Sequence, residues 1–466
     1  MAAGSGLREA KIVMLIAMMA FTFQFDAALV TVSLPDMARE LSTTSGGVSL
    51  VLLSYLMGAV VTFIPAGKLG DKLGLRSVCL AGCALATAGT ILCGLAHSID
   101  MLVFSRVLQG IGAGAFVATG FAMMPTWVSP ERVGWGYGMQ SLGAGAGMVM
   151  GVPAGGILSH YLSWQWIFIV SVPLFVALLV SAWRIVPDGR HQSLNKGMAI
   201  HWDVMAMFAV LIATATILFS NGVESGWLSF PVLASLGVIL IMSMGLRIAA
   251  GRGRRLFSAG LFGNMSAVHA LAAMLCIAAV AGGLRYVLPF YLEVACGLSV
   301  LSSSYLLLAF PVGYAPASVL AGRISDRYGS RRIVLLATVA CTALCIAFGV
   351  TSGFNAAWLA LVFTLAFGAA TGLYFAPANR LIMKSMPEDQ RGEAGGALSV
   401  VFNFGTLLGI ALFEVAMTWH SDAGSPVPDV SSLAAGGLGV GYSFAVGALL
   451  AMLAVMLSVW TRPDDD

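Results

Sequence analysis

The chain has 466 residues, of which 59% are hydrophobic and only 10% are charged, and its formal net charge is +3. Soluble domains carry about 25% charged residues and about 45–50% apolar ones, so a chain this apolar cannot cover its surface in water. The composition excludes a soluble globular protein, and lipid is the expected solvent.

Long apolar runs separated by short charged strips predict fourteen membrane-spanning helices, because each span needs about 20 mostly apolar residues. The first run follows a basic stub but is too long for a signal peptide and lacks a small-residue cleavage site, so we expect a retained span. An even number of spans places both termini on one side. The runs lie near residues 12–34, 46–66, 77–96, 101–124, 134–157, 165–185, 202–220, 229–248, 266–292, 302–321, 333–351, 355–379, 394–418 and 440–460.

The basic residues orient these spans. If both termini are cytoplasmic, all but three of the 24 Lys and Arg residues fall in the inner strips, and only Arg39 falls in an outer loop. The other two, Arg106 and Arg285, fall inside spans. The positive-inside rule therefore predicts a multi-pass protein of the cell membrane with both termini in the cytoplasm.

A duplicated loop predicts two related halves. The strip after span 2 reads GKLGDKLGLR from Gly67, and the strip after span 10 reads GRISDRYGSRR from Gly322, 255 positions later. Parallel repeats of this kind are typical of transporters whose halves rock about a central site. The candidate gating residues are Gly67, Asp71, Gly74, Arg76, Gly322, Asp326, Arg327, Gly329 and Arg332.

The repeat leaves spans 7 and 8 without counterparts. We therefore predict an all-α integral membrane protein with two pseudo-symmetric six-helix bundles and two extra central helices. The bundles are expected at residues 1–190 and 259–466, and the two inserted helices with their inner loops at residues 191–258.

Further motifs carry a resemblance to a known family. Span 1 reads DAALVTVSLP from Asp26 to Pro35, and span 4 reads RVLQGIG from Arg106. Together with the loop copies, these motifs resemble those of the major facilitator superfamily, and the two extra helices match its fourteen-helix drug:proton antiporter family. Lys72 and Leu75 replace the arginines usual in the first loop, and several span-1 side chains differ. The resemblance implies the transporter fold and proton coupling.

Span 5 carries small residues at four-residue spacing, similar to the antiporter motif Gly-Pro-x-x-Gly-Gly with its proline shifted by one. Glycines on one face let a neighbouring helix approach closely, so this helix and, by pseudosymmetry, one of the other half are expected to pivot tightly. A close-packed helix pair without any role in antiport is the alternative. This ridge comprises Gly143, Gly147, Gly151, Pro153, Gly155 and Gly156.

Ionisable residues inside spans are the candidates for chemistry, because burying a charge in a bilayer costs about 2.5–3.5 kcal/mol or more. Asp26 and Arg106 are expected to line the central cavity, either as a structural ion pair or as the site of proton coupling. Glu414 in span 13 is a second proton candidate. Glu293, near the outer end of span 9, is either a third or a wetted rim residue. The polar candidates for the cavity lining are Gln109, Asn379 and Asn403.

Arg285 in span 9 departs from what an exporter of cations would need in its cavity. It could pair with Glu293 or with Glu414, or it could bind an anionic substrate, and the sequence does not choose among these.

The leading hypothesis is a proton-coupled exporter of amphiphilic small molecules that works by alternating access. The alternative is a proton-linked carrier of a specific metabolite, lipid, peptide or organic anion. The sequence has no zinc-type histidine pair, Walker loop or nucleotide domain, so an enzyme is not expected. The seven cysteines lie mostly in apolar runs and are interpreted as small hydrophobic residues rather than metal ligands. We expect no cofactor, metal, nucleic acid or soluble partner, and a monomer in the bilayer.

Overall fold

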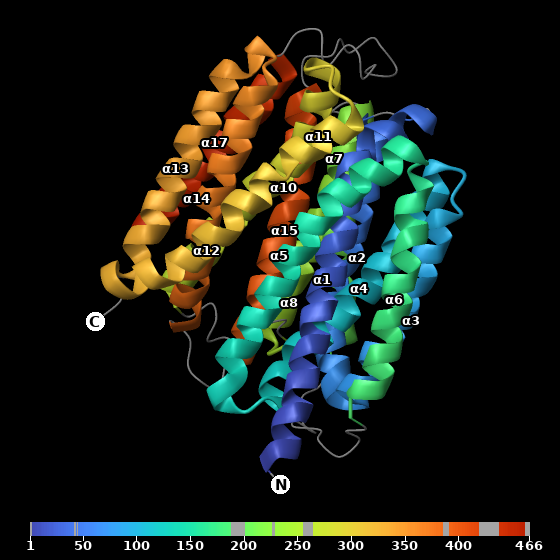
Figure 1. Cartoon of the computed structure of the whole chain (residues 1–466), viewed down its shortest axis with the longest axis vertical. Helices are drawn as coiled ribbons and strands as arrows, with labels where there is room; N and C mark the ends of the chain where they lie inside the picture. The colour runs from blue at the N-terminus through green and yellow to red at the C-terminus, as the bar shows by residue number, and fades with distance from the viewer. Residues whose placement is uncertain are drawn as a thin grey trace. The chain divides into compact units, whose positions relative to one another are not determined.

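The structure of the protein is a computed structural model, and the residues that it describes are 2–41, 43, 45–187, 201–225, 229–254, 264–384, 391–418 and 438–461. All regular structure in these ranges is helical (Figure 1). The helices are α1 (Ala2–Glu40), α2 (Ser45–Leu73), α3 (Leu75–Gly94), α4 (Ile99–Trp127), α5 (Pro130–Tyr161), α6 (Gln165–Ile185), α7 (Trp202–Ser225), α8 (Phe230–Gly251), α10 (Met265–Phe290), η1 (Tyr291–Ala295), α11 (Val300–Leu307), α12 (Ala309–Tyr328), α13 (Ser330–Thr351), η2 (Ser352–Phe354), α14 (Ala357–Lys384), α15 (Arg391–Thr418) and α17 (Leu438–Val459).

Thirteen helical stretches within the described residues are long and apolar enough to cross a membrane. The seventh expected span falls in α7, whose described apolar part, Trp202–Leu218, is shorter than the rest. The all-α, multi-pass class is therefore confirmed, whereas the count of fourteen spans is not.

Prolines interrupt two of the spans in the C-terminal half. Pro289 is followed by the short π-helix η1, in which the Cys296 amide donates to the Tyr291 carbonyl at 3.0 Å. A turn at Leu308 separates α11 from α12, three residues before Pro311. Proline has no amide hydrogen and its ring crowds the carbonyl four residues back, so both irregularities have a local cause.

The described helices fall into two compact units. Unit 1 comprises Met1–Val30, Ser54–Ile212 and Met242–Leu256, and unit 2 comprises Thr31–Leu53, Ala213–Ile241 and Phe257–Asp466. The last ten residues of α1, Thr31–Glu40, and the first turns of α2 thus belong to unit 2, with the C-terminal helices. The division of the sequence at residues 190 and 258 stays a prediction, since both boundaries lie outside the described ranges.

Four helix pairings of unit 1 recur in unit 2. In unit 1, α3 packs against α4 and α6, α2 packs against α4, and α1 packs against α5. In unit 2, α13 packs against α14 and α17, α12 packs against α14, and α10 packs against α15. Helices in equivalent positions of the sequence repeat therefore have equivalent neighbours, as two pseudo-symmetric bundles require.

Candidate functional site

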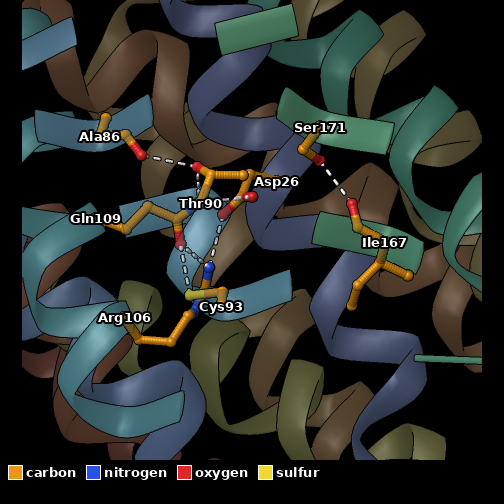
Figure 2. A network of polar contacts seen from close by, with 8 residues as sticks. All are labelled: Asp26, Ala86, Thr90, Cys93, Arg106, Gln109, Ile167 and Ser171. Carbon is orange, nitrogen blue, oxygen red and sulfur yellow. Dashed lines mark hydrogen bonds and ion pairs between the residues drawn. The ribbon is translucent and has the colours of Figure 1, made fainter. Parts of the chain in front are cut away.

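A buried ion pair joins α1 to α4 in unit 1 (Figure 2). Arg106 Nη1 lies 2.8 Å from Asp26 Oδ2, and the two side chains are 0% and 1% exposed. Gln109, one turn along α4, accepts a hydrogen bond from the same arginine nitrogen at 2.6 Å and donates from Nε2 to Asp26 Oδ1 at 3.0 Å. Both carboxylate oxygens of Asp26 therefore accept hydrogen bonds from α4. Three of the residues that the sequence singled out lie in one network.

Two residues of α3 extend this network, and the sequence pattern did not point to either of them. Gln109 Nε2 also donates to Thr90 Oγ1 at 2.8 Å, and the Thr90 hydroxyl donates to the Ala86 carbonyl at 2.8 Å (Figure 2). Cys93 Sγ lies 3.8 Å from Gln109 Oε1. Thr90 and Cys93 are three residues apart, so their side chains lie on the same face of an otherwise apolar helix. This spacing is the sequence signal that could have identified the two residues as part of the site.

Glycines allow α3 and α4 to approach closely enough for this network to form. A Cβ atom added at Gly89 would lie 2.5 Å from the backbone nitrogen of Gln109. A Cβ atom at Gly112 would meet the backbone of Ala86 in the same way. Because backbone atoms rather than flexible side chains fill these positions, any side chain there would separate the two helices and move Gln109 away from Thr90.

Aromatic rings from α2 and α6 cover the arginine. Arg106 Cζ lies 4.4 Å from the centroid of the Tyr55 ring and 5.5 Å from that of Phe168. Both rings are fully buried, and a guanidinium group over an aromatic face is stabilised by the ring quadrupole. The Arg106 charge is therefore held by a carboxylate, an amide oxygen and two rings. If Asp26 lost its negative charge, Arg106 would remain as a buried cation without its counter-ion, which is strongly destabilising. The contact between α1 and α4 is therefore sensitive to the charge of Asp26.

Glu293 lies in η1 and is more buried than a wetted rim residue. Its side chain is 4% exposed, and its Oε2 lies 3.4 Å from Nη2 of Arg39 in the last turn of α1. Arg39, which is 63% exposed, also pairs with Asp36 at 2.5 Å. Glu293 Oε1 is buried and has no hydrogen-bond partner among the described residues. The Oε2 oxygen of Glu293 thus has only a 3.4 Å contact to an exposed arginine among the described residues, and the Oε1 oxygen has no hydrogen-bond partner there.

Glu414 is completely buried in α15, as expected for a residue deep in a span. Its Oε2 accepts a hydrogen bond of 2.5 Å from the hydroxyl of Ser49 on α2. Both residues belong to unit 2, because the first turns of α2 are part of that unit. A short bond to a carboxylate oxygen is typical of a charge-assisted hydrogen bond. Ser49 carries no motif, so nothing in the sequence pattern pointed to it.

Arg285 pairs with neither of the two glutamates. Within the described part of the chain, no hydrogen bond or ion pair connects Arg285 to Glu293, Glu414 or another acid.

Of the two asparagines expected at the cavity, Asn403 is buried and donates from Nδ2 to the Ser399 carbonyl of its own helix at 2.8 Å. Asn379 is exposed near the end of α14.

The two loop copies share one backbone feature and one side-chain contact. Gly74 and Gly329, which precede α3 and α13, both have positive φ. Arg76 donates from Nη2 to the Trp183 carbonyl at the end of α6 at 2.9 Å, and Arg331 donates to the Val459 carbonyl at the end of α17. Arg331, which the offset of 255 positions between the two loop copies aligns with Arg76, is thus also its structural equivalent. Arg332, the arginine named as a gating candidate, is exposed. Gly67 lies in α2, and the side-chain environments of Asp71, Gly322, Asp326 and Arg327 lie outside what the structure describes.

The small-residue ridge of α5 packs directly on the backbone of α1. A Cβ atom on the four ridge glycines at four-residue spacing, Gly143 to Gly155, would lie within 3.0 Å of a main-chain carbonyl oxygen of α1. In unit 2, Gly405 and Gly409 of α15 approach the backbone of α10 in the same way. Gly156 is buried and Pro153 is partly exposed. The glycines Gly143, Gly147, Gly151 and Gly155 face the carbonyls of Ala17, Phe21, Phe25 and Leu29 respectively.

Comparisons with known proteins agree with the all-helical, two-bundle fold described above. A family model described as "Major Facilitator Superfamily" matches residues 16–410 and 270–466. A protein of Klebsiella pneumoniae (strain 342) named "Putative multidrug resistance protein MdtD" is 26% identical over 398 residues, which cover 84% of this chain and 83% of the relative. The protein of the same name from Serratia proteamaculans (strain 568) is also 26% identical, over 84% of this chain and 82% of its own length. The crystal structure of a D-xylose-proton symporter superposes with a TM-score of 0.66 at 14% identity, covering 97% of this chain and 98% of the symporter, which shows a common fold.

Proposed function

This chain belongs to the Major Facilitator Superfamily, and we propose that it is a secondary active exporter which carries amphiphilic small molecules across the cell membrane in exchange for protons. The multidrug resistance names of its relatives support the exporter part of this proposal. The repeated helix pairings support alternating access, because two similar bundles can rock about a site between equivalent helices. The positive-inside pattern supports cytoplasmic termini.

The observation that carries proton coupling is the network of Asp26, Arg106 and Gln109. A proton bound to Asp26 would remove the charge that Arg106 pairs with and would turn one carboxylate oxygen from an acceptor into a donor. Protonation and the ion pair therefore compete for the same carboxylate. Because the pair connects α1 to α4, a change in the protonation of Asp26 alters the contact between two helices of the bundle.

The energy available from a proton is sufficient for export. One proton entering down a potential of about 150 mV supplies roughly 3.5 kcal/mol, at about 2.3 kcal/mol per 100 mV. Since every 1.4 kcal/mol corresponds to about a tenfold ratio, this supports an outward gradient of several hundredfold for a neutral substrate.

Further roles follow as parts of the same proposal. Glu414 and Glu293 are the second and third candidates for proton binding, since both are buried carboxylates in unit 2. The loop copies around Gly74 and Gly329 gate the cytoplasmic side, and the glycine ridge of α5 serves as the surface on which α1 moves.

A second candidate function is a proton-linked carrier of an organic anion or of one specific metabolite. Arg285 favours it, because this cation inside a span is not neutralised by any acid in the described residues. The two candidates share the fold and the proton site and differ in whether the chain exports varied amphiphiles or carries one kind of molecule.

Proton exchange in everted vesicles tests the proposal. A vesicle is acidified inside, a pH-sensitive dye reports the gradient, and rhodamine 6G, 1-naphthoate and an uncharged amphiphile are added in turn. Wild type is expected to release protons on addition of a substrate, Asp26→Asn is expected to release none, and Asp26→Glu is expected to retain part of the response. The matched control is Asp100→Asn, the same change at an exposed position of α4. Proton release by Asp26→Asn equal to that of wild type would show that coupling does not depend on Asp26.

A further inference from the structure

Arg285 is the one accessible residue on a long buried stretch of α10. Every other residue from Cys276 to Leu292 is buried, whereas Arg285 is partly exposed. The neighbours of this helix within unit 2 include α14, α15 and α17. Since the residues on both sides of Arg285 along the helix are enclosed by protein, Arg285 is the position on this stretch of α10 that a ligand can reach.

No protein group neutralises this arginine in the described part of the chain. No hydrogen bond or ion pair to Arg285 is formed there. Tyr314 of α12 lies close enough for the two side chains to interact electrostatically. A charge held in a low-dielectric region without a counter-ion is costly, and an arginine kept there in spite of that cost is a binding-site candidate.

Tyr314, which interacts electrostatically with Arg285, belongs to an aromatic pair on α12. The ring of Tyr314 stacks on that of Phe310 with centroids 6.0 Å apart, and both residues are partly exposed. Tyr314 thus places a phenol hydroxyl and, together with Phe310, two aromatic faces of α12 within electrostatic range of the Arg285 guanidinium group of α10. Guanidinium groups bind carboxylates and sulfonates through paired N–H donors, and aromatic faces bind flat apolar groups.

The other ionisable groups inside the spans offer no comparable site for a cation. Asp26 is 1% exposed and its two oxygens are bonded to Arg106 and Gln109. Glu414 is fully buried, and Glu293 is 4% exposed. Among the ionisable residues deep inside the described spans, Arg285 is therefore the accessible one, and its positive charge selects for negatively charged ligands.

We propose that Arg285 and Tyr314 bind the anionic group of the transported molecule, a carboxylate or sulfonate on an aromatic amphiphile, while Phe310 packs against its apolar part. This inference rests on the proposed export function and names the substrate class of the exporter as anionic or zwitterionic. The guanidinium group supplies the charge, and the phenol supplies an additional hydrogen bond.

Binding of two matched probes to the purified full-length protein in detergent tests the assignment without any need for transport or a proton gradient. The probes are radiolabelled 1-naphthoate and 1-naphthylmethylammonium, which share a ring system and differ in the sign of their charge. Wild type is expected to bind 1-naphthoate at least tenfold more tightly. Arg285→Gln is expected to lose about tenfold to a hundredfold in affinity for 1-naphthoate, in line with a hydrogen bond to a charged group. Its affinity for the ammonium probe should stay the same.

Three further variants complete the test. Arg285→Lys is expected to retain part of the preference, and Tyr314→Phe is expected to weaken binding of the anion by a few fold. Arg247→Gln, which removes an exposed arginine of α8, is expected to bind as wild type does. Wild type without a preference for 1-naphthoate would overturn the proposal whether or not any variant folds, and so would Arg285→Gln with the preference intact. Because this assay needs no proton coupling, its failure is distinguishable from a failure of the vesicle assay with Asp26→Asn.

Discussion

Gly74 and Gly329 have the same backbone conformation, with φ and ψ of 93° and 136° in the first and 82° and 142° in the second. The amide of Gly74 donates to the Gly70 carbonyl at 2.9 Å, and that of Gly329 donates to the Ser325 carbonyl at 3.1 Å. The two loops that connect α2 to α3 and α12 to α13 therefore repeat in conformation as well as in sequence. A side chain is disfavoured in this conformation, because this region of φ and ψ is essentially open to glycine alone.

Alanine at either loop glycine is expected to destabilise the protein. Gly74→Ala and Gly329→Ala should each cost about 1–3 kcal/mol, the usual cost of a strained backbone conformation. The measurement is the Tm of the purified protein in detergent. Gly67→Ala is the matched control from the same motif, since a Cβ atom at this helical position meets no atom within 4 Å. A Tm of Gly74→Ala equal to that of the control would contradict the strain argument.

Of the two neighbouring arginines in the second loop, Arg331 is expected to contribute to thermal stability and Arg332 is not. Arg331 holds the last turn of α17 through the Val459 carbonyl, as Arg76 holds α6 through Trp183. A cation near the C-terminus of a helix contributes about 0.3–1 kcal/mol, and a hydrogen bond adds to this. Arg331→Gln and Arg76→Gln should therefore lower the Tm to a similar extent, whereas Arg332→Gln should not. Equal losses for Arg331→Gln and Arg332→Gln would argue for a general charge effect.

The fold could be predicted from the sequence because its determinants are local or repeated. Apolar runs of spanning length predict helices, and the two loop copies predict two halves with equivalent neighbours. The count of fourteen spans depended on the stretch at 202–220, where the described apolar helix is short. The break at Leu308 was not predicted, because the same apolar pattern fits one continuous helix and two short ones equally well.

The candidate site was predicted only where a residue was chemically unusual for a span. Asp26 and Arg106 stand out because charges inside a bilayer are rare, and their pairing follows from charge. Ser49 and Tyr55 do not stand out, since serine and tyrosine are common in helices of membrane proteins. Their contacts with Glu414 and Arg106 depend on helix rotation, which hydropathy does not specify.

Single methyl groups on the α5 ridge are expected to separate α5 from α1. Gly143→Ala and Gly147→Ala would place a Cβ atom against the carbonyls of Ala17 and Phe21, and overpacking of this kind typically costs about 1–3 kcal/mol. Gly145→Ala on the same helix meets no atom within 4 Å and serves as the control. Loss of thermal stability and of substrate-driven proton release in the ridge variants, with neither in Gly145→Ala, is the expected result. Ridge variants that retain full stability and activity would show that this close approach has no role.

A double-mutant cycle is expected to separate the structural role of the Asp26–Arg106 pair from its role in coupling. Asp26→Asn removes the negative charge opposite a buried arginine, and removal of one partner of a buried pair costs about 3–5 kcal/mol. Arg106→Gln should cost a similar amount. The double variant Asp26→Asn, Arg106→Gln should regain much of this stability, because neither charge is then left opposite an uncharged group. Thermal unfolding in detergent measures the four proteins of the cycle.

The same cycle applied to proton release gives the decisive contrast. If Asp26 carries the proton, the double variant is stable but still releases no protons on addition of substrate, because its carboxylate is absent. If the pair only connects α1 to α4, the double variant regains proton release together with stability. The exposed pair of Asp203 and Arg254, joined at 2.9 Å, is the control cycle, in which no measurable coupling is expected in either readout because solvent screens both charges.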